Sequence, residues 1–180
     1  NSHFDEISAV QYYMKAYHIA LEQNNLHEQM VILNNLCVLF MQKNDTVEAL
    51  RYIRNAYEVF LKQQTPPEDH AQLIVILNLV ELYIRNGQLN EAENIYAAYG
   101  PLLHEGQAKG LRLHVALLCE LFLADAFHRS DEIQKIADYF ASAKLHHHLN
   151  RSMYFAFYND IFDILLNIKD KKRCEQFLQY

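Results

Sequence analysis

Glycine and proline are scarce in this chain, and tryptophan is absent. Its 180 residues include 4 Gly and 3 Pro. Because β-rich folds use these residues at many of their turns, the low counts disfavour such a fold. No run of 18 apolar residues occurs, and no signal-peptide pattern opens the sequence. The sequence therefore predicts no membrane span and no membrane partner.

Cysteine is also rare, and its placement bears on the compartment. The 3 Cys, at positions 37, 119 and 174, are far apart and lie in apolar stretches. Disulfide scaffolds use even numbers of closely spaced cysteines, so buried reduced thiols are the better interpretation. We expect a cytoplasmic protein.

The charge balance restricts the partners. Formal net charge is −6, 51% of the residues are hydrophobic and 21% are charged. This composition is typical of a folded domain with a sizeable core rather than of a disordered chain. An acidic surface repels phosphate backbones, so nucleic acid is not expected as a partner.

Helical periodicity runs through nearly the whole chain, and no segment alternates as a strand does. Short polar connections separate the periodic segments, which favours antiparallel neighbours. Thr65, with Pro66 and Glu68 behind it, predicts a capped helix start, as Asp45 does with Glu48. Gly100-Pro101 predicts a helix end. The fold class expected is all-α, with about nine helices at 5–24, 27–43, 46–63, 67–86, 89–99, 108–128, 131–144, 150–168 and 171–180.

An internal repeat of about 41 residues connects these helices. Anchor positions 9, 49, 92, 133 and 174 hold Ala, Ala, Ala, Ile and Cys. Five residues before the last four anchors stand Asn44, Gly87, His128 and Lys169, each expected at a helix–helix turn. Small residues two helical turns apart, such as Ala49 and Ala56, allow a neighbouring helix to approach closely. We therefore expect stacked helix pairs, each of which completes its core against the next.

The residues at these positions resemble the tetratricopeptide repeat family, best over "ILNNLCVLFMQKNDTVEALRYIRNAYEVF" (32–60) and "LNLVELYIRNGQLNEAENIY" (77–96). Later units depart from the pattern, since Ile133 and Cys174 replace small residues and Glu120 stands where an apolar residue is expected. The spacing also exceeds the family's usual period of about 34 residues. The resemblance implies one right-handed α-solenoid of antiparallel helix pairs over 1–180. Its packing residues would be Ala9, Ala16, Phe40, Ala49, Ala56, Tyr83, Gly87 and Ala92.

The resemblance also implies a concave face built from the first helix of each pair. Such a face would bind a protein or peptide through asparagine amides and apolar side chains. A solvated or self-packed face is the alternative for each residue. The candidates are Asn34, Asn35, Val38, Met41, Ile74, Asn78, Glu81, Arg85, Leu118, Phe122, Asn159 and Asp163.

Motifs of catalysis and of cofactor binding are missing from the sequence, which has no glycine-rich phosphate loop, CxxC pair or HExxH. His146, His147 and His148 are consecutive, and residues about 100° apart on a helix do not converge on one ion. Asp160 and Asp163 form one notable carboxylate pair, which we interpret as solvated or groove-lining. We expect no enzyme activity, no metal and no cofactor.

The function expected is a non-catalytic, protein- or peptide-binding scaffold. The first helix resembles half of a pair, which suggests a fragment of a longer protein, as in the sensory or regulatory segments of bacterial signalling proteins. An alternative is a self-association module, for instance a homodimer, that controls an output domain outside this chain, such as a diguanylate cyclase or a DNA-binding regulator. An RNA-binding helical repeat ranks third, because Glu81, Asp160 and Asp163 oppose a basic groove.

Overall fold

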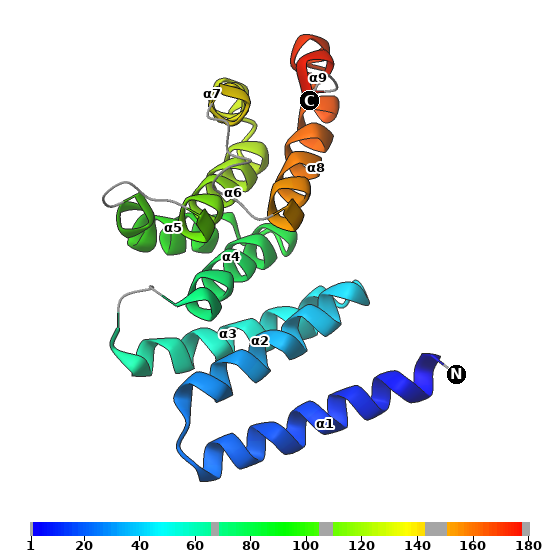
Figure 1. The fold of residues 1–180 in the computed structure, drawn as a ribbon, viewed down its shortest axis with the longest axis vertical. Helices are drawn as coiled ribbons and strands as arrows, with labels where there is room; N and C mark the ends of the chain where they lie inside the picture. Colours follow the sequence, from blue (N-terminus) through cyan, green and yellow to red (C-terminus); the bar gives the residue numbers. More distant parts are fainter. Residues whose placement is uncertain (1, 66–68, 105–109, 143–150, 178–180) are drawn as a thin grey trace. The chain divides into compact units, whose positions relative to one another are not determined.

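Helices make up the fold of the chain. A computed structural model describes the backbone of residues 2–65, 69–104, 110–142 and 151–177, and the side chains of 8–65, 69–103, 111–139 and 159–175. The described residues contain helices and no strand, so the all-α prediction is confirmed. Figure 1 shows them in chain order: α1 (Ser2–Glu22), α2 (Leu26–Gln42), α3 (Thr46–Gln63), α4 (His70–Arg85), α5 (Leu89–His104), α6 (Gly110–Ala126), α7 (Ser130–Ser142), α8 (Arg151–Asn167) and α9 (Lys171–Phe177).

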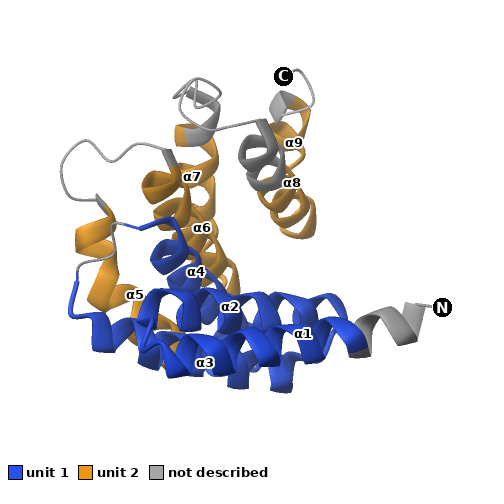
Figure 2. Ribbon diagram, turned by 60° about the horizontal axis from the view of Figure 1, so that its bottom comes forward, with its two compact units in different colours: residues 1–88 blue, residues 89–180 orange. Residues whose placement is uncertain are grey.

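Two compact units divide the chain, one over Asn1–Gln88 and one over Leu89–Tyr180 (Figure 2). In unit 1, α2 contacts α1, α3 and α4, and α3 also contacts α4. In unit 2, α6 contacts α5, α7 and α8, and α8 contacts α9. Each unit has large side chains that are under 2% exposed, such as Ile53 and Ile76 in unit 1 and Leu121 and Ile161 in unit 2. Burying a side chain of this size stabilises the fold by about 1.5–3 kcal/mol. The expected single domain over 1–180 stays a prediction.

One turn geometry recurs five times. A residue with positive φ (52° to 70°) follows α1, α2, α4, α6 and α8. The next N–H donates to the carbonyl five residues earlier, at 2.7 to 3.0 Å. This is the Schellman motif, which satisfies carbonyls that a helix end leaves open. Four of the turns are those predicted from the repeat, and the first is additional; the left-handed residues are Asn24, Asn44, Gly87, His128 and Lys169.

At three of these turns, the residue after the left-handed position also caps the N-terminus of the next helix. The side chains of Asn25, Asp45 and Asp170 each accept from the backbone N–H three residues ahead, at 3.1 to 3.2 Å. A single short polar segment therefore ends one helix and caps the next. The cap predicted at Asp45 is confirmed.

The predicted start of the fourth helix at Thr65 is wrong. The cap is Asp69, whose Oδ1 accepts from the Ala71 N–H at 3.2 Å. Its own N–H donates to Gln72 Oε1, also at 3.2 Å, which completes a capping box. Thr65 Oγ1 instead accepts from Gln72 Nε2 at 3.0 Å. Two cap signals lay close together, and the one with the reciprocal hydrogen bonds is used.

The predicted helix end at Gly100-Pro101 is also wrong, because α5 continues to His104 with Pro101 inside it. A Cβ on Gly100 would lie 3.0 Å from the Tyr96 ring, so the glycine makes room for an aromatic side chain one turn earlier. Pro101 is exposed, which leaves water free to hydrogen-bond the carbonyl that a proline orphans in a helix.

Small residues lie where the repeat predicts close packing. Ala49, Ala56 and Ala92 are 0% exposed. Ile133 is 0% exposed and Cys174 is 7% exposed, so the larger anchors are buried as well. Ala9 and Ala16 on α1 are half-buried.

Candidate functional site

The predicted binding residues of unit 1 lie on two helices in contact, α2 and α4. We call their shared surface the α2–α4 face. Asn35, Val38, Met41 and Ile74 are half-buried, and Arg85 is exposed. Half-buried side chains on two helices in contact are partly accessible and are held on rigid elements, which suits a binding surface. The members are Asn34, Asn35, Val38 and Met41 on α2, and Ile74, Asn78, Glu81 and Arg85 on α4.

Two of these residues bind each other. Asn78 Nδ2 donates to Asn34 Oδ1 at 2.9 Å, and Asn78 is 8% exposed. A buried amide needs such a partner because leaving it unsatisfied costs about 1–3 kcal/mol. The pair therefore holds α2 against α4, which makes Asn78 a packing residue as much as a candidate contact.

Charge on the α2–α4 face is concentrated at Glu81 and Arg85. Arg85 Nη2 lies 2.5 Å from Glu81 Oε1, one helical turn away. Burial raises the pKa of the Glu81 carboxyl, and the Arg85 guanidinium opposes that rise. Burial, together with the Glu81 charge, raises the pKa of the Cys37 thiol to about 12. Cys37 is therefore a neutral, buried side chain and not a nucleophile at neutral pH.

The predicted residues of unit 2 lie on α6 and α8, which are also in contact. Leu118 is 4% exposed and belongs to the core, while Phe122 is half-buried. Asn159 and Asp163 are exposed on α8. Unit 2 thus offers fewer accessible apolar groups at these positions than the α2–α4 face does.

Chemistry-bearing clusters are few in the part of the chain that the structure describes. No group of three or more His, Cys, Asp or Glu side chains there is placed to hold a metal ion. His146, His147 and His148 lie outside the described residues. Within the same described ranges, none of the helices combines the length and the apolar character that crossing a bilayer requires.

Polar contacts between helices of one unit are what sequence reasoning missed. Arg54 on α3 donates to Gln88 Oε1 at 3.0 Å, and its guanidinium lies 5.1 Å from the centre of the Tyr83 ring. Arg129, before α7, donates to Glu93 on α5 at 3.0 Å. Arg173 on α9 binds both carboxylate oxygens of Asp138 on α7 at 2.8 Å. In each case the two residues are 34 to 36 positions apart, which is shorter than the repeat. That constant separation of an arginine from a hydrogen-bonding partner was the available signal in the sequence.

Glu120, which departs from the apolar pattern, has a specific partner. The hydroxyl of Tyr96 donates to Glu120 Oε1 at 2.6 Å. Burial, reinforced by this carboxylate, raises the pKa of Tyr96 above its usual range. The hydrogen bond joins α5 to α6 and explains why a carboxylate is tolerated in this half-buried place.

The fold and the face define an all-helical protein whose helices are joined by a recurring Schellman turn. Comparison of the chain with family models, with curated proteins and with solved structures finds no match. The argument for function therefore depends on the geometry of the chain itself.

Proposed function

We propose that this chain is a non-catalytic scaffold that binds a protein or peptide on the α2–α4 face. The observation that carries the proposal is the Asn34–Asn78 hydrogen bond of 2.9 Å, which fixes two helices beside half-buried Asn35, Val38 and Met41. A face that is already ordered loses little conformational entropy when it binds.

The chemistry of the face suits a short peptide segment. The Asn35 amide offers one acceptor and two donors to a peptide backbone. Val38 and Met41 offer apolar contact, and methionine adapts to side chains of different shape. Glu81 and Arg85, already paired, would stay at the rim.

The larger architecture is part of the same proposal. The repeat of five Schellman turns and buried small anchors supports stacked antiparallel helix pairs in a right-handed, tetratricopeptide-like solenoid. In that setting the chain would be the sensory or regulatory segment of a bacterial signalling protein. This last step is an analogy from fold alone.

A peptide selection tests the binding face. Peptides are selected from a displayed random library on the purified chain, and their affinity is measured by fluorescence anisotropy. Val38→Arg should weaken binding at least tenfold, which corresponds to about 1.4 kcal/mol. The matched control is Val47→Arg, at a 71% exposed valine on α3, which should change affinity less than twofold. Equal loss in both variants, or no enriched peptide, would contradict the proposal.

The alternative function is self-association that controls an attached output domain. Exposed apolar residues such as Tyr12 and Ile19 on α1, 70% and 53% exposed, favour it. Sedimentation equilibrium distinguishes the two, because a scaffold stays near 21.2 kDa as concentration rises whereas a self-association module approaches twice that mass.

A further inference from the structure

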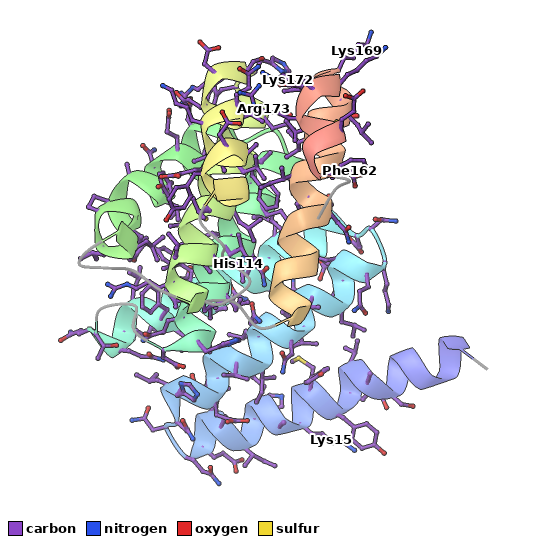
Figure 3. The ribbon with its side chains drawn as sticks, turned by 45° about the horizontal axis from the view of Figure 1, so that its top comes forward. Lys15, His114, Phe162, Lys169, Lys172 and Arg173 are labelled. Carbon is purple, nitrogen blue, oxygen red and sulfur yellow. The ribbon has the colours of Figure 1, made fainter. Side chains whose placement is uncertain are left out.

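An apolar pocket lies between α8 and α9, away from the residues used so far. Its volume is about 300 Å³. This is at the lower end of the range for small-molecule sites, about 300–1,000 Å³. Figure 3 shows Phe162 on α8 and Lys169 in the turn that leads to α9. The pocket is lined by Phe162, Leu166, Lys169, Lys171, Cys174 and Glu175.

The walls of this pocket are apolar. Phe162 is half-buried, Leu166 is 51% exposed and Cys174 is 7% exposed. Burial, followed by the charge of Asp170, raises the pKa of the Cys174 thiol, so the sulfur is neutral at physiological pH. The pocket therefore presents a large, accessible apolar side chain, Leu166, together with the uncharged thiol of Cys174.

The repeat register shows that one wall residue of the pocket, Phe162, stands at a position that is core in the earlier repeats. Phe162 stands 12 residues before its anchor, Cys174. The equivalent residues before the three preceding anchors are Cys37, Val80 and Leu121, and all are 0% exposed. In α8 the same register position instead opens into a pocket. An apolar ligand group would add contacts to the part of the half-buried Phe162 side chain that is accessible from the pocket.

The rim of the pocket is charged, and the charges are available. Within the described residues, neither Lys169 nor Lys171 makes an ion pair. Arg173 is different, since its guanidinium is held by Asp138 and by Asp170, each at 2.8 Å. Glu175, one helical turn after Lys171, offsets part of the positive charge. Two lysines and one glutamate leave a rim charge of about +1, which matches a single carboxylate better than a polyanion.

We propose that this pocket binds a medium-chain amphiphile with one carboxylate, whose tail contacts Phe162 and Leu166 and whose head group lies between Lys169 and Lys171. At about 30 Å³ for each water-sized group, the volume accommodates roughly ten such groups, the size of an eight-carbon acid. The site is in unit 2 and does not depend on peptide binding at the α2–α4 face of unit 1.

Octanoate is the probe for the test, with octylammonium as its opposite-charge counterpart. Titration into the ¹⁵N-labelled chain should give saturable amide shifts in α8 and α9 for octanoate, and binding at least fivefold weaker for octylammonium. The double variant Lys169→Gln/Lys171→Gln should abolish that preference. The control is Lys172→Gln, a neighbouring exposed lysine that does not line the pocket (Figure 3). Equal binding of the two probes to the unmodified chain would overturn the proposal.

A second pair of variants tests the apolar wall. Leu166→Asp should reduce octanoate affinity at least tenfold. The matched control, Leu61→Asp on α3, alters a leucine that is 52% exposed against 51% for Leu166, and should leave affinity unchanged. Both side chains are exposed, so both variants should keep the helical circular dichroism of the parent chain. Absence of saturable shifts in the parent chain, or equal loss in both variants, would also overturn the site.

Discussion

At the scale of single residues, Ala49 shows why size matters at the anchor positions. It is 0% exposed on α3, the helix that contacts both α2 and α4. Ala49→Leu should overpack this contact and lower the free energy of unfolding by about 1–3 kcal/mol. Urea denaturation followed by circular dichroism measures the change. Ala97→Leu at an exposed position of α5 is the control, expected within about 0.5 kcal/mol of the parent. Similar losses in both would show that Ala49 is not a close-packing position.

His114 is a second residue whose burial has a measurable effect. It is 6% exposed on α6, and burial lowers its pKa from 6.5 to about 4. Between these values the unfolded chain binds a proton that the folded chain does not. The contribution of His114 to stability is therefore complete above pH 6.5 and is lost as the pH drops towards 4, by about 3 kcal/mol for a shift of this size.

His114→Gln removes the titrating group and should flatten the dependence of unfolding free energy on pH between 6.5 and 4. Urea titrations at a series of pH values measure the slope. His70→Gln, at an exposed histidine of α4, is the control for the loss of a histidine as such. An unchanged slope in His114→Gln would assign the pH dependence to other groups.

At the scale of elements, the turns are more uniform than the residues that form them. The left-handed position is Gly once, Asn twice, His once and Lys once. A Cβ on Gly87 (φ +70°) would meet nothing within 4 Å, so the cost of Gly87→Ala is the backbone conformation alone, about 1 kcal/mol. Lys169→Gly relieves the same strain and should be neutral or stabilising by up to about 1 kcal/mol. In thermal unfolding, the midpoint temperature of Gly87→Ala should fall, whereas that of Lys169→Gly should stay the same or rise. A matching fall in both would contradict the strain argument.

The element scale also shows how far the sequence could predict the fold. Helices and turns were predictable because apolar periodicity and the 41-residue register are local signals. The start of α4 was missed because Thr65 and Asp69 both carry cap spacing. The Gln72 side chain accepts from the Asp69 N–H and donates to Thr65 Oγ1, and the sequence alone did not show that these hydrogen bonds select Asp69. The end of α5 was missed because Gly100 accommodates the Tyr96 ring, a packing role that composition does not reveal.

The candidate site was less predictable than the fold. Helical register placed Asn34 and Asn78 on a shared face, but it did not show that they bind each other. Leu118 was expected on a surface and is 4% exposed, because register alone cannot show what covers a residue. The pocket at Phe162 was missed for the same reason, since its equivalents Cys37 and Leu121 are buried.

At the scale of the whole molecule, the two compact units and the continuous repeat lead to different expectations of how the chain unfolds. The 41-residue register passes through residue 88, where the units divide. In stacked repeats stability is the sum of local terms, so a change in one unit should act mainly within it. Ile53 on α3 and Ile161 on α8 are matched probes, because both are isoleucines at 0% exposure in different units.

Ile53→Val and Ile161→Val should each cost about 0.5–1.5 kcal/mol, which is small enough for the chain to stay folded. Hydrogen exchange measured by mass spectrometry then reports protection helix by helix. Ile53→Val should lower protection in α2, α3 and α4 several-fold while α6 and α8 change little, and Ile161→Val should give the reverse. Equal loss across all helices in both variants would mean that the 180 residues unfold as one cooperative block, as expected of the single domain that the register suggests. The comparison is internally controlled, because each variant is the reference for the other.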